Sequence, residues 1–399
     1  MRVLEAVFWV CAAGVVYGYV GYPLALFCLA RLRPRPVRFD ATPTGTADFL
    51  PTVSIVIAAY NEAHRIADRR DEFTSVLEAE GIDGEIIIVS DGSADATAAA
   101  ARDGAGARVR VIDLAQNVGK AEALTRGVAA ATGDVIVFAD TRQRWSADAL
   151  RRLLENFRDP SVGGASGDLV LASRSGATSG VGLYWRYEKA VRTLESCVHS
   201  TVGATGAISA VRRVLFRPIP RRILLDDVYW PLHVVMQGFR VIHDGRAAAY
   251  DALPDKARDE FRRKVRTLTG NFQLVSHAPE ILLPWRNPLW LGFLSKKLLR
   301  LAVPWLLLGM LLTTALLPGR LYRAALIMQM AGYLIGIAGI NPMIASRARI
   351  ASAAGSFLFL NAAAWIAFWV WVLGRADRSW KKIPYIEVPV PTAAATPSA

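Results

Sequence analysis

The sequence is poor in cysteine, and its cysteines form no familiar spacing. Three are present among 399 residues. Cys11 and Cys28 lie in the first apolar stretch and Cys197 stands alone, so neither a zinc-site spacing nor a disulfide framework occurs. This pattern suits a domain that is kept in a reducing compartment such as the cytosol.

Acidic charge is also in short supply. Lysine and arginine together number 47 against 34 aspartate and glutamate residues, which gives a net charge of +13. A basic chain attracts phosphates, anionic lipids or nucleic acid. No arginine-rich run alternates with aromatic residues, so we expect no nucleic-acid partner. Many basic residues flank apolar segments instead, which makes membrane lipid the expected partner.

Long apolar runs are confined to the two ends of the chain. Residues 6–30 form a run long enough to span a bilayer. Arginines follow at once, so the positive-inside rule places the next segment in the cytosol. Residues 288–300 combine Trp and Leu with Lys and Arg, which is typical of an interfacial helix. Three more runs of spanning length follow, over residues 301–317, 321–344 and 351–373.

We therefore expect a multi-pass protein of the cell (inner) membrane with its central domain in the cytosol. The expected parts are a transmembrane helix (1–30), a linker (31–50), a cytosolic domain (51–284), an interfacial amphipathic helix (285–300), three transmembrane helices (301–374) and a polar, partly disordered tail (375–399). Four spans put the C-terminus outside, yet Arg375, Arg378, Lys381 and Lys382 favour the cytosol. Either one span is re-entrant or these charges are interfacial. The sequence sets no oligomeric state.

The central region alternates strands with helices. Apolar, β-branched runs at residues 53–59, 85–89, 109–113 and 134–139 predict buried strands with helices between them. This alternation predicts an α/β fold with a parallel sheet, in which ligands bind at the carboxyl ends of the strands. Asn61, Asp91 and Asp140 are each expected just past a strand end. A single Asp there more often makes a turn or caps a helix. Three polar side chains at the same edge of the sheet, however, indicate a ligand crevice.

Two later segments each allow two interpretations, a structural one and a functional one. A loop of small residues contains Gly203 and Gly206, which either make a tight connection or let a ligand approach the backbone closely. Asp226 and Asp227 open the apolar run 223–237. They either cap a helix or act on a ligand, because a carboxylate in apolar surroundings must be solvated, paired or used.

The helix expected over residues 259–274 carries a basic stripe. Arg262 and Arg266 lie one turn apart on one face. The stripe is a solvated surface, the polar side of a helix that lies on the membrane, or an anion clamp.

Taken in order, these motifs resemble those of the membrane-embedded family-2 glycosyltransferases, the group of the hyaluronan, cellulose, chitin and poly-N-acetylglucosamine synthases. The resemblance covers residues 51–317. Its motifs are AAYNE at 58–62, SDGS at 90–93, Gly119-Lys120, the loop from Gly203 to Arg212, Asp226-Asp227, and the segment from Arg263 to Arg266. The resemblance implies a GT-A catalytic domain, with a Rossmann-like and mostly parallel sheet, joined to α-helical transmembrane segments.

The resemblance also implies roles for individual residues. Asp227 would be the catalytic base, Asp91 would bind the uracil or ribose, and Lys120 would meet the nucleotide diphosphate. Asp140 would ligate a divalent cation, Mg²⁺ or Mn²⁺. Arg263 and Arg266 would face the diphosphate. The full set of implied substrate-binding residues is Asn61, Glu62, Asp91, Lys120, Asp140, Gly203, Gly206, Asp226, Arg263 and Arg266.

Two departures from the family pattern bear on the chemistry. Arg142 stands where the second aspartate of the D-x-D metal motif is expected, and an arginine binds phosphate rather than a cation. Thr267 stands where the family has a tryptophan that, in the processive polymerases, stacks near the growing chain. The first departure puts the cation in question, and the second favours the addition of one or a few sugars.

The expected function is an inverting transfer of a sugar from a nucleotide-sugar donor, UDP-linked, to a glycan or lipid-linked acceptor at the cytosolic face of the membrane. It would serve polysaccharide or glycolipid synthesis. One alternative is a catalytically impaired nucleotide-sugar-binding protein that is the partner of another synthase. Another is a transporter, which would need polar or broken spans. The strongly polar residues of the spans are few, mainly Gln329, Asn341 and Asn361.

Overall fold

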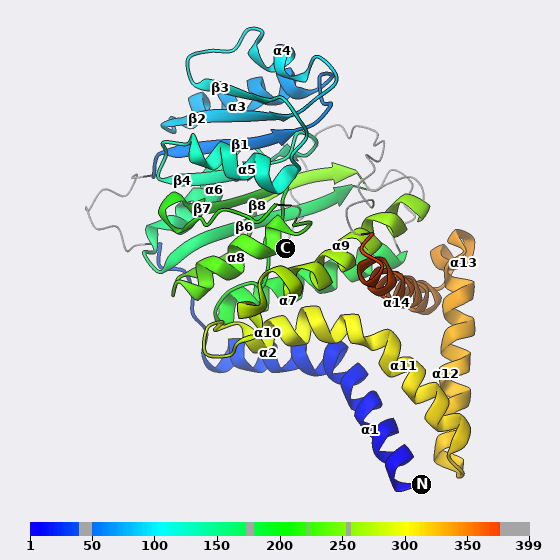
Figure 1. The fold of residues 1–399 in the computed structure, drawn as a ribbon. Coiled ribbons are helices and arrows are strands. Elements are labelled where there is room, and N and C mark those ends of the chain that lie inside the picture. Colours follow the sequence, from blue (N-terminus) through cyan, green and yellow to red (C-terminus); the bar gives the residue numbers. More distant parts are fainter. Residues whose placement is uncertain (40–49, 173–178, 222, 253–256, 376–399) are drawn as a thin grey trace. The chain divides into compact units, whose positions relative to one another are not determined.

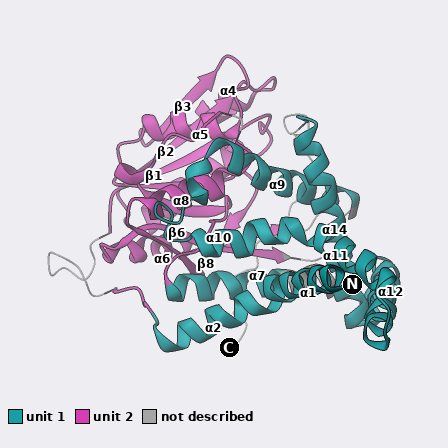
Figure 2. Cartoon of the chain, turned by 60° about the horizontal axis from the view of Figure 1, so that its bottom comes forward, with its two compact units in different colours: residues 1–34, 173–198, 255–383 teal, residues 35–172, 199–254, 384–399 magenta. Residues whose placement is uncertain are grey.

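The structure is a computed structural model of the chain, and it describes residues 1–39, 50–172, 179–221, 223–252 and 257–375. The chain divides into two compact units (Figure 2). Of the described residues, the sheet unit comprises 35–39, 50–172, 199–221 and 223–252, and the helical unit comprises 1–34, 179–198 and 257–375. Most of the expected linker and nearly all of the expected tail lie outside the described residues.

The sheet unit is built on one eight-stranded sheet with the order β3-β2-β1-β4-β7-β6-β8-β5 (Figure 1). Its strands are β1 Val53–Ala59, β2 Gly84–Asp91, β3 Val109–Leu114, β4 Val135–Ala139, β5 Arg144–Trp145, β6 Val162–Ala172, β7 Ile208–Arg212 and β8 Arg240–Ala252. The first four pair in parallel, which confirms the predicted α/β alternation. β7 then runs antiparallel to both β4 and β6, while β6 and β8 are parallel.

Helices pack on this sheet through small and apolar residues. They are α3 Ile66–Ala79, α4 Thr97–Arg102, α5 Lys120–Ala129, α6 Ala149–Glu155 and α8 Asp226–Met236, with 3₁₀ turns at Asn156–Arg158 and Arg213–Leu215. Alternate residues of β1, such as Ile55 and Ile57, are buried in a core with Phe73 and Leu77 of α3. α5 lies close to the other face, because a Cβ on Gly127 would stand 2.4 Å from a methyl carbon of Val56.

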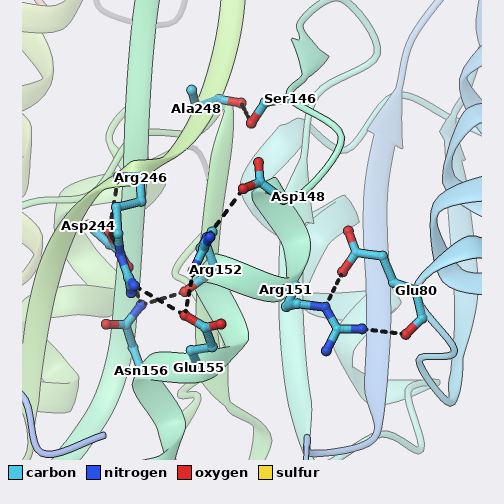
Figure 3. Close-up of polar contacts among 10 residues, drawn as sticks. All are labelled: Glu80, Ser146, Asp148, Arg151, Arg152, Glu155, Asn156, Asp244, Arg246 and Ala248. Carbon is cyan, nitrogen blue, oxygen red and sulfur yellow. Dashed lines mark hydrogen bonds and ion pairs between the residues drawn. The ribbon is translucent and has the colours of Figure 1, made fainter. Parts of the chain in front are cut away.

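A polar network fastens α6 to its neighbours (Figure 3). Arg246 of β8 donates to Asp244 and to Glu155 at the end of α6, and Asn156 donates to Asp244 at 2.8 Å. On the other side of α6, Arg151 donates to the backbone oxygen of Glu80, just past α3, at 2.6 Å. α6 is therefore fixed by polar contacts with β8 on one side and with the end of α3 on the other.

The helical unit contains long apolar helices. Its elements are α1 Arg2–Val16, a π-helix Tyr17–Gly21, α2 Tyr22–Leu32, α7 Ser179–Val198, α9 Ala257–His277, a 3₁₀ turn Pro279–Leu282, α10 Trp290–Phe293, a π-helix Leu294–Leu298, α11 Leu299–Leu316, α12 Arg320–Gly339, α13 Pro342–Arg347 and α14 Arg349–Val372. Four helices are long and apolar enough to cross a membrane, namely Arg2–Leu32, Trp290–Leu316, Arg320–Gly339 and Arg349–Val372. α7 and α9, which the expected 51–284 domain included, group with these helices.

Buried ion pairs connect helices within this unit. Lys296 donates to Oε2 of Glu195 at 2.7 Å, and Tyr22 donates to Oε1 of the same carboxylate at 2.9 Å. One helix turn further along the chain, Arg300 of α11 pairs with Glu188 of α7. Each of these four charged side chains thus has a partner of opposite charge inside the unit, as buried charges require.

Candidate active site

The loops after β1 and β2 are bonded to each other. Asn61 adopts a left-handed conformation with φ of 55°, and its Oδ1 accepts a hydrogen bond from the Ala94 N–H at 2.8 Å. The Asn61 N–H donates to the Ser93 hydroxyl at 3.1 Å, and the Glu62 N–H donates to that of Thr97 at 2.8 Å. The structure therefore brings the predicted pair Asn61-Glu62 against the SDGS segment. Ser93 and Thr97 act as its anchors.

Asp91 is the last residue of β2, whereas the sequence predicted it just past the strand. Its carboxylate accepts hydrogen bonds from the N–H groups of Val118 at 2.7 Å and Gly119 at 3.0 Å. Asn117 donates to its backbone oxygen at 3.1 Å. Burial raises the pKa of Asp91, although the two N–H donors act in the opposite direction. Asp91 thus holds the loop that leads into α5. This structural role comes in addition to its expected contact with a nucleoside, which stays a prediction.

Lys120, the first residue of α5, lies among carboxylates. Its Nζ is 2.7 Å from Oδ1 of Asp140 and 3.9 Å from Oδ2 of Asp226. Burial lowers the pKa of Lys120, but Asp140, Asp226 and then Asp227 outweigh this and raise it above its usual range. The ammonium group is therefore held in its charged form, as an anion-binding site requires.

The glycine loop passes directly over this lysine. A Cβ on Gly206 would stand 3.2 Å from Nζ of Lys120. At the other end of the loop, a Cβ on Gly203 would stand 3.3 Å from the backbone oxygen of Asp227, to which the Ala204 N–H donates at 2.7 Å. The backbone comes close to the ammonium group at Gly206 and to the backbone of Asp227 at Gly203, so both glycines serve a tight connection. Contact of this loop with a ligand stays a prediction.

Asp226 and Asp227 are the first two residues of α8. They occupy the helix N-terminus, where carboxylates are stabilised by the helix dipole. Capping alone does not explain why Asp226 also faces Lys120 across 3.9 Å. The structural interpretation therefore holds for both residues, and the helix start also places Asp226 beside the lysine. The action of the pair on a ligand stays a prediction.

Other predicted site residues lie elsewhere in the chain. Arg263 and Arg266 are on α9 of the helical unit, where Arg263 pairs with Glu260 at 2.8 Å. Their expected contact with the diphosphate stays a prediction. Sequence reasoning also missed Asp251 of β8, the partner of Arg142. The only signal was the arginine in the D-x-D position, and nothing in the sequence pointed to a partner 109 residues away.

The residues around Asp140 do not fit a divalent cation as they lie. Within the described part of the chain, no group of three or more His, Cys, Asp or Glu side chains is arranged to hold a metal ion. The Lys120 ammonium takes the position beside Oδ1 of Asp140, and the second motif position is the cationic Arg142. Hard divalent cations need several oxygen ligands. Here a lysine already pairs with the Asp140 carboxylate, and the second motif position supplies no oxygen ligand.

Comparison with known proteins finds a family model that matches part of the chain. Residues 54–220 match the model of glycosyl transferase family 2. This confirms the resemblance seen in the motifs and supports a glycosyltransferase.

The curated relatives are polysaccharide synthases. The poly-β-1,6-N-acetyl-D-glucosamine synthase of Staphylococcus aureus strain COL is 25% identical over 261 residues, which cover 60% of each chain. That of Staphylococcus epidermidis is 25% identical over 236 residues, which cover 56% of this chain and 55% of the relative. The match therefore spans little more than half the length of these relatives.

A solved structure confirms the fold. It is a mannosyltransferase from Pyrobaculum calidifontis, in complex with GDP-mannose and Mn²⁺, and it superposes with a TM-score of 0.66. The two are 22% identical, and the superposition covers 92% of this chain and 99% of the other. At that identity the likeness concerns the GT-A fold with its accompanying helices. The four long apolar helices, together with the synthase relatives, indicate a membrane protein.

Proposed function

We propose that this chain transfers a sugar from a UDP-linked donor to a glycan or lipid-linked acceptor, with inversion at the anomeric carbon. The reaction takes place at the cytosolic face of the cell membrane and serves polysaccharide or glycolipid synthesis. The observation that carries the proposal is Lys120, which lies 2.7 Å from Asp140 and 3.9 Å from Asp226 under the glycine loop. A protonated lysine at the start of a helix, next to the glycine loop, is suited to binding a diphosphate.

The chemistry divides between a base and a cation. The acceptor hydroxyl loses its proton to Asp227 as its oxygen forms a bond to the anomeric carbon. The bond from that carbon to the diphosphate breaks on the opposite side, so the configuration inverts and UDP leaves. Lys120 stabilises the charge that develops on the diphosphate. Asp91, which holds the loop before Lys120, positions this cation and lies close to the nucleoside.

The acceptor reaches the site from the membrane. Acceptors of this kind are either a lipid-linked sugar or a glycan held near the apolar helices. The curated relatives make N-acetylglucosamine the first sugar to test. Thr267 in place of a stacking tryptophan favours one or a few additions over a long polymer.

A second candidate is a nucleotide-sugar-binding partner of another synthase that has lost its own activity. Arg142 in the metal motif favours this candidate. It predicts donor binding without turnover.

The deciding experiment compares variants on a panel of radiolabelled UDP-sugars, beginning with UDP-N-acetylglucosamine. Membranes that carry the wild type, Asp227→Asn or the control Asp148→Asn are assayed, and the products are sized. Loss of a general base lowers the rate by about 10²–10⁴-fold, so Asp227→Asn should be nearly inactive. Asp148 is 56% exposed at the start of α6 and pairs with Arg152, so its variant should match the wild type. Turnover that Asp227→Asn leaves unchanged would contradict the role of Asp227 as base.

A further inference from the structure

The side chain two residues after Asp140 is held by a carboxylate on another strand. Arg142 donates from Nε to Oδ1 of Asp251 at 3.0 Å, and from Nη2 to Oδ2 at 2.7 Å. Gln143 donates to the same carboxylate at 3.0 Å. Two parallel bonds are the fork geometry by which a guanidinium matches a carboxylate or a phosphate. The pair therefore fixes the orientation of the guanidinium.

The strand order places this pair at the same edge of the sheet as Asp140. β7 is antiparallel to both β4 and β6, and β6 is parallel to β8, so β4 and β8 end at one edge. Asp140 follows the last residue of β4, and Asp251 is the last but one residue of β8. β5 pairs Arg144 with Tyr250, which holds the intervening chain against the end of β8.

Burial differs between the two partners. The side chain of Asp251 is buried, whereas that of Arg142 keeps 27% of its surface exposed. A buried carboxylate needs the arginine as its counter-ion. Arg142 is therefore a partly exposed cationic side chain at the strand ends, where ligands bind in α/β sheets. Lys120 and Arg142 therefore both belong to the carboxyl end of the sheet, where the donor is expected.

We infer that Arg142, oriented by Asp251, binds the diphosphate of the sugar donor directly and supplies the positive charge that a bound divalent cation would otherwise bring. Donor binding then requires no divalent cation. Asp251 is a positioning residue, since it acts through Arg142. The inference rests on the proposed function, because it specifies how the same site holds its donor.

The first test measures nucleotide binding, which needs no turnover. The purified full-length chain in detergent is titrated calorimetrically with UDP and, in parallel, with GDP, once in EDTA and once in Mn²⁺. We expect the same dissociation constant in both solutions. Binding that occurs only in Mn²⁺ would overturn the inference and leave the proposed function standing. Binding of neither nucleotide in either solution would overturn both.

The second test replaces the arginine and uses a neighbour as control. Charge-assisted hydrogen bonds account for a factor of roughly ten to a hundred in affinity, so Arg142→Met should weaken UDP binding in EDTA by that factor. Arg144, two residues further on, pairs with Glu72 and is 31% exposed. Because it is expected to have no contact with the donor, Arg144→Met should bind UDP as the wild type does. Equal weakening by both variants would overturn the inference.

A third variant reverses the charge. Arg142→Asp restores a second carboxylate, so UDP binding should become dependent on Mn²⁺.

A fourth variant tests the positioning residue. Asp251→Asn removes the counter-ion and should weaken UDP binding less than Arg142→Met, because the guanidinium remains. Thermal unfolding without nucleotide is measured for every variant. If Arg142→Met does not fold, the comparison of the wild type in EDTA and in Mn²⁺ decides the inference alone.

Discussion

Two lysines of this chain each pair with a carboxylate at the same distance but differ in their surroundings. Lys120 in the sheet unit and Lys296 in the helical unit each lie 2.7 Å from a carboxylate oxygen. Lys120 is 28% exposed and has a second carboxylate 3.9 Å away. Lys296 is 5% exposed, and its partner Glu195 also accepts from Tyr22. An open lysine among several carboxylates can exchange a partner for a ligand, whereas a closed pair serves the fold.

The largest expected effect comes from breaking the closed pair. Glu195→Gln leaves the Lys296 charge buried without its counter-ion, and breaking such a pair costs about 3–5 kcal/mol of stability. We expect a much lower unfolding temperature in detergent and an unchanged transfer rate per folded molecule. The measurement is a thermal melt together with the sugar-transfer assay.

Two controls sharpen this prediction. Replacing both partners, as Glu195→Leu with Lys296→Met, should recover much of the lost stability, because a buried pair is often no better than apolar side chains. Arg152→Gln removes an exposed partner of Asp148 and should change little. If the double variant were no more stable than Glu195→Gln, the pair would not be the source of the loss.

The next prediction concerns Lys120, the more exposed of the two lysines. Lys120→Met removes the cation from the expected diphosphate site, and loss of one such stabilising group lowers the rate by about 10²–10³-fold. Stability should fall little, because the carboxylates around it are partly exposed. Transfer kinetics and a thermal melt check both parts. Normal transfer by Lys120→Met would make the open lysine as structural as the closed one.

The sequence allowed good prediction of the sheet where strands are apolar and β-branched. β1 and β4 have the bounds expected from their runs, with β4 beginning one residue later. β6 and β8 were not predicted as strands. Their sequences, VGGASGDLVLA and RVIHDGRAAAYDA, are rich in Gly and Ala, which strands disfavour. Their pairing with each other over about 80 residues of sequence, rather than local preference, fixes them as strands.

The site was predictable in composition and less so in its contacts. Lys120, Asp140, Asp226 and the glycine loop come together as a single cluster. The bonds of Asp91 to the loop at 118–119 could not be foreseen. Backbone N–H donors look alike in a sequence, so only the folded loop shows which of them face a carboxylate.

A smaller effect should follow from disturbing the loop that carries the open lysine. Gly92 has φ of +61°, and a Cβ there would stand 2.2 Å from the backbone nitrogen of Asn117. Gly92→Ala therefore adds a backbone clash to the about 1–2 kcal/mol of left-handed strain. The clash should displace the loop before Lys120 and weaken UDP binding, which titration calorimetry measures.

Gly238 is the matched control for this variant. It also has a positive φ, +89°, but apart from Gly238 and its two chain neighbours, no heavy atom of the described residues lies within 4 Å of the position its Cβ would take. Gly238→Ala should lower stability by the strain alone, about 1–2 kcal/mol, and leave UDP binding unchanged. Equal loss of binding in the two variants would show that general destabilisation, not the loop, is responsible.

The smallest effect concerns a closed carboxylate inside the sheet unit itself. Burial acts to raise the pKa of Asp244, but hydrogen bonds from Arg246 and Asn156 outweigh it and lower that pKa (Figure 3). A lowered pKa means that the ionised group stabilises the fold above the usual Asp pKa of about 4, and that this contribution is lost as the pH falls through the lower folded value.

Asp244→Asn should therefore reduce stability at neutral pH by about 1 kcal/mol, a small value because Arg246 is partly exposed to solvent. The difference from the wild type should shrink as the pH falls below about 4. Thermal melts at several pH values measure it, with the exposed Asp148→Asn as the control. Transfer at neutral pH should be unaffected. A large loss of transfer in Asp244→Asn would break the division between open and closed charges, because a closed pair would then serve the site.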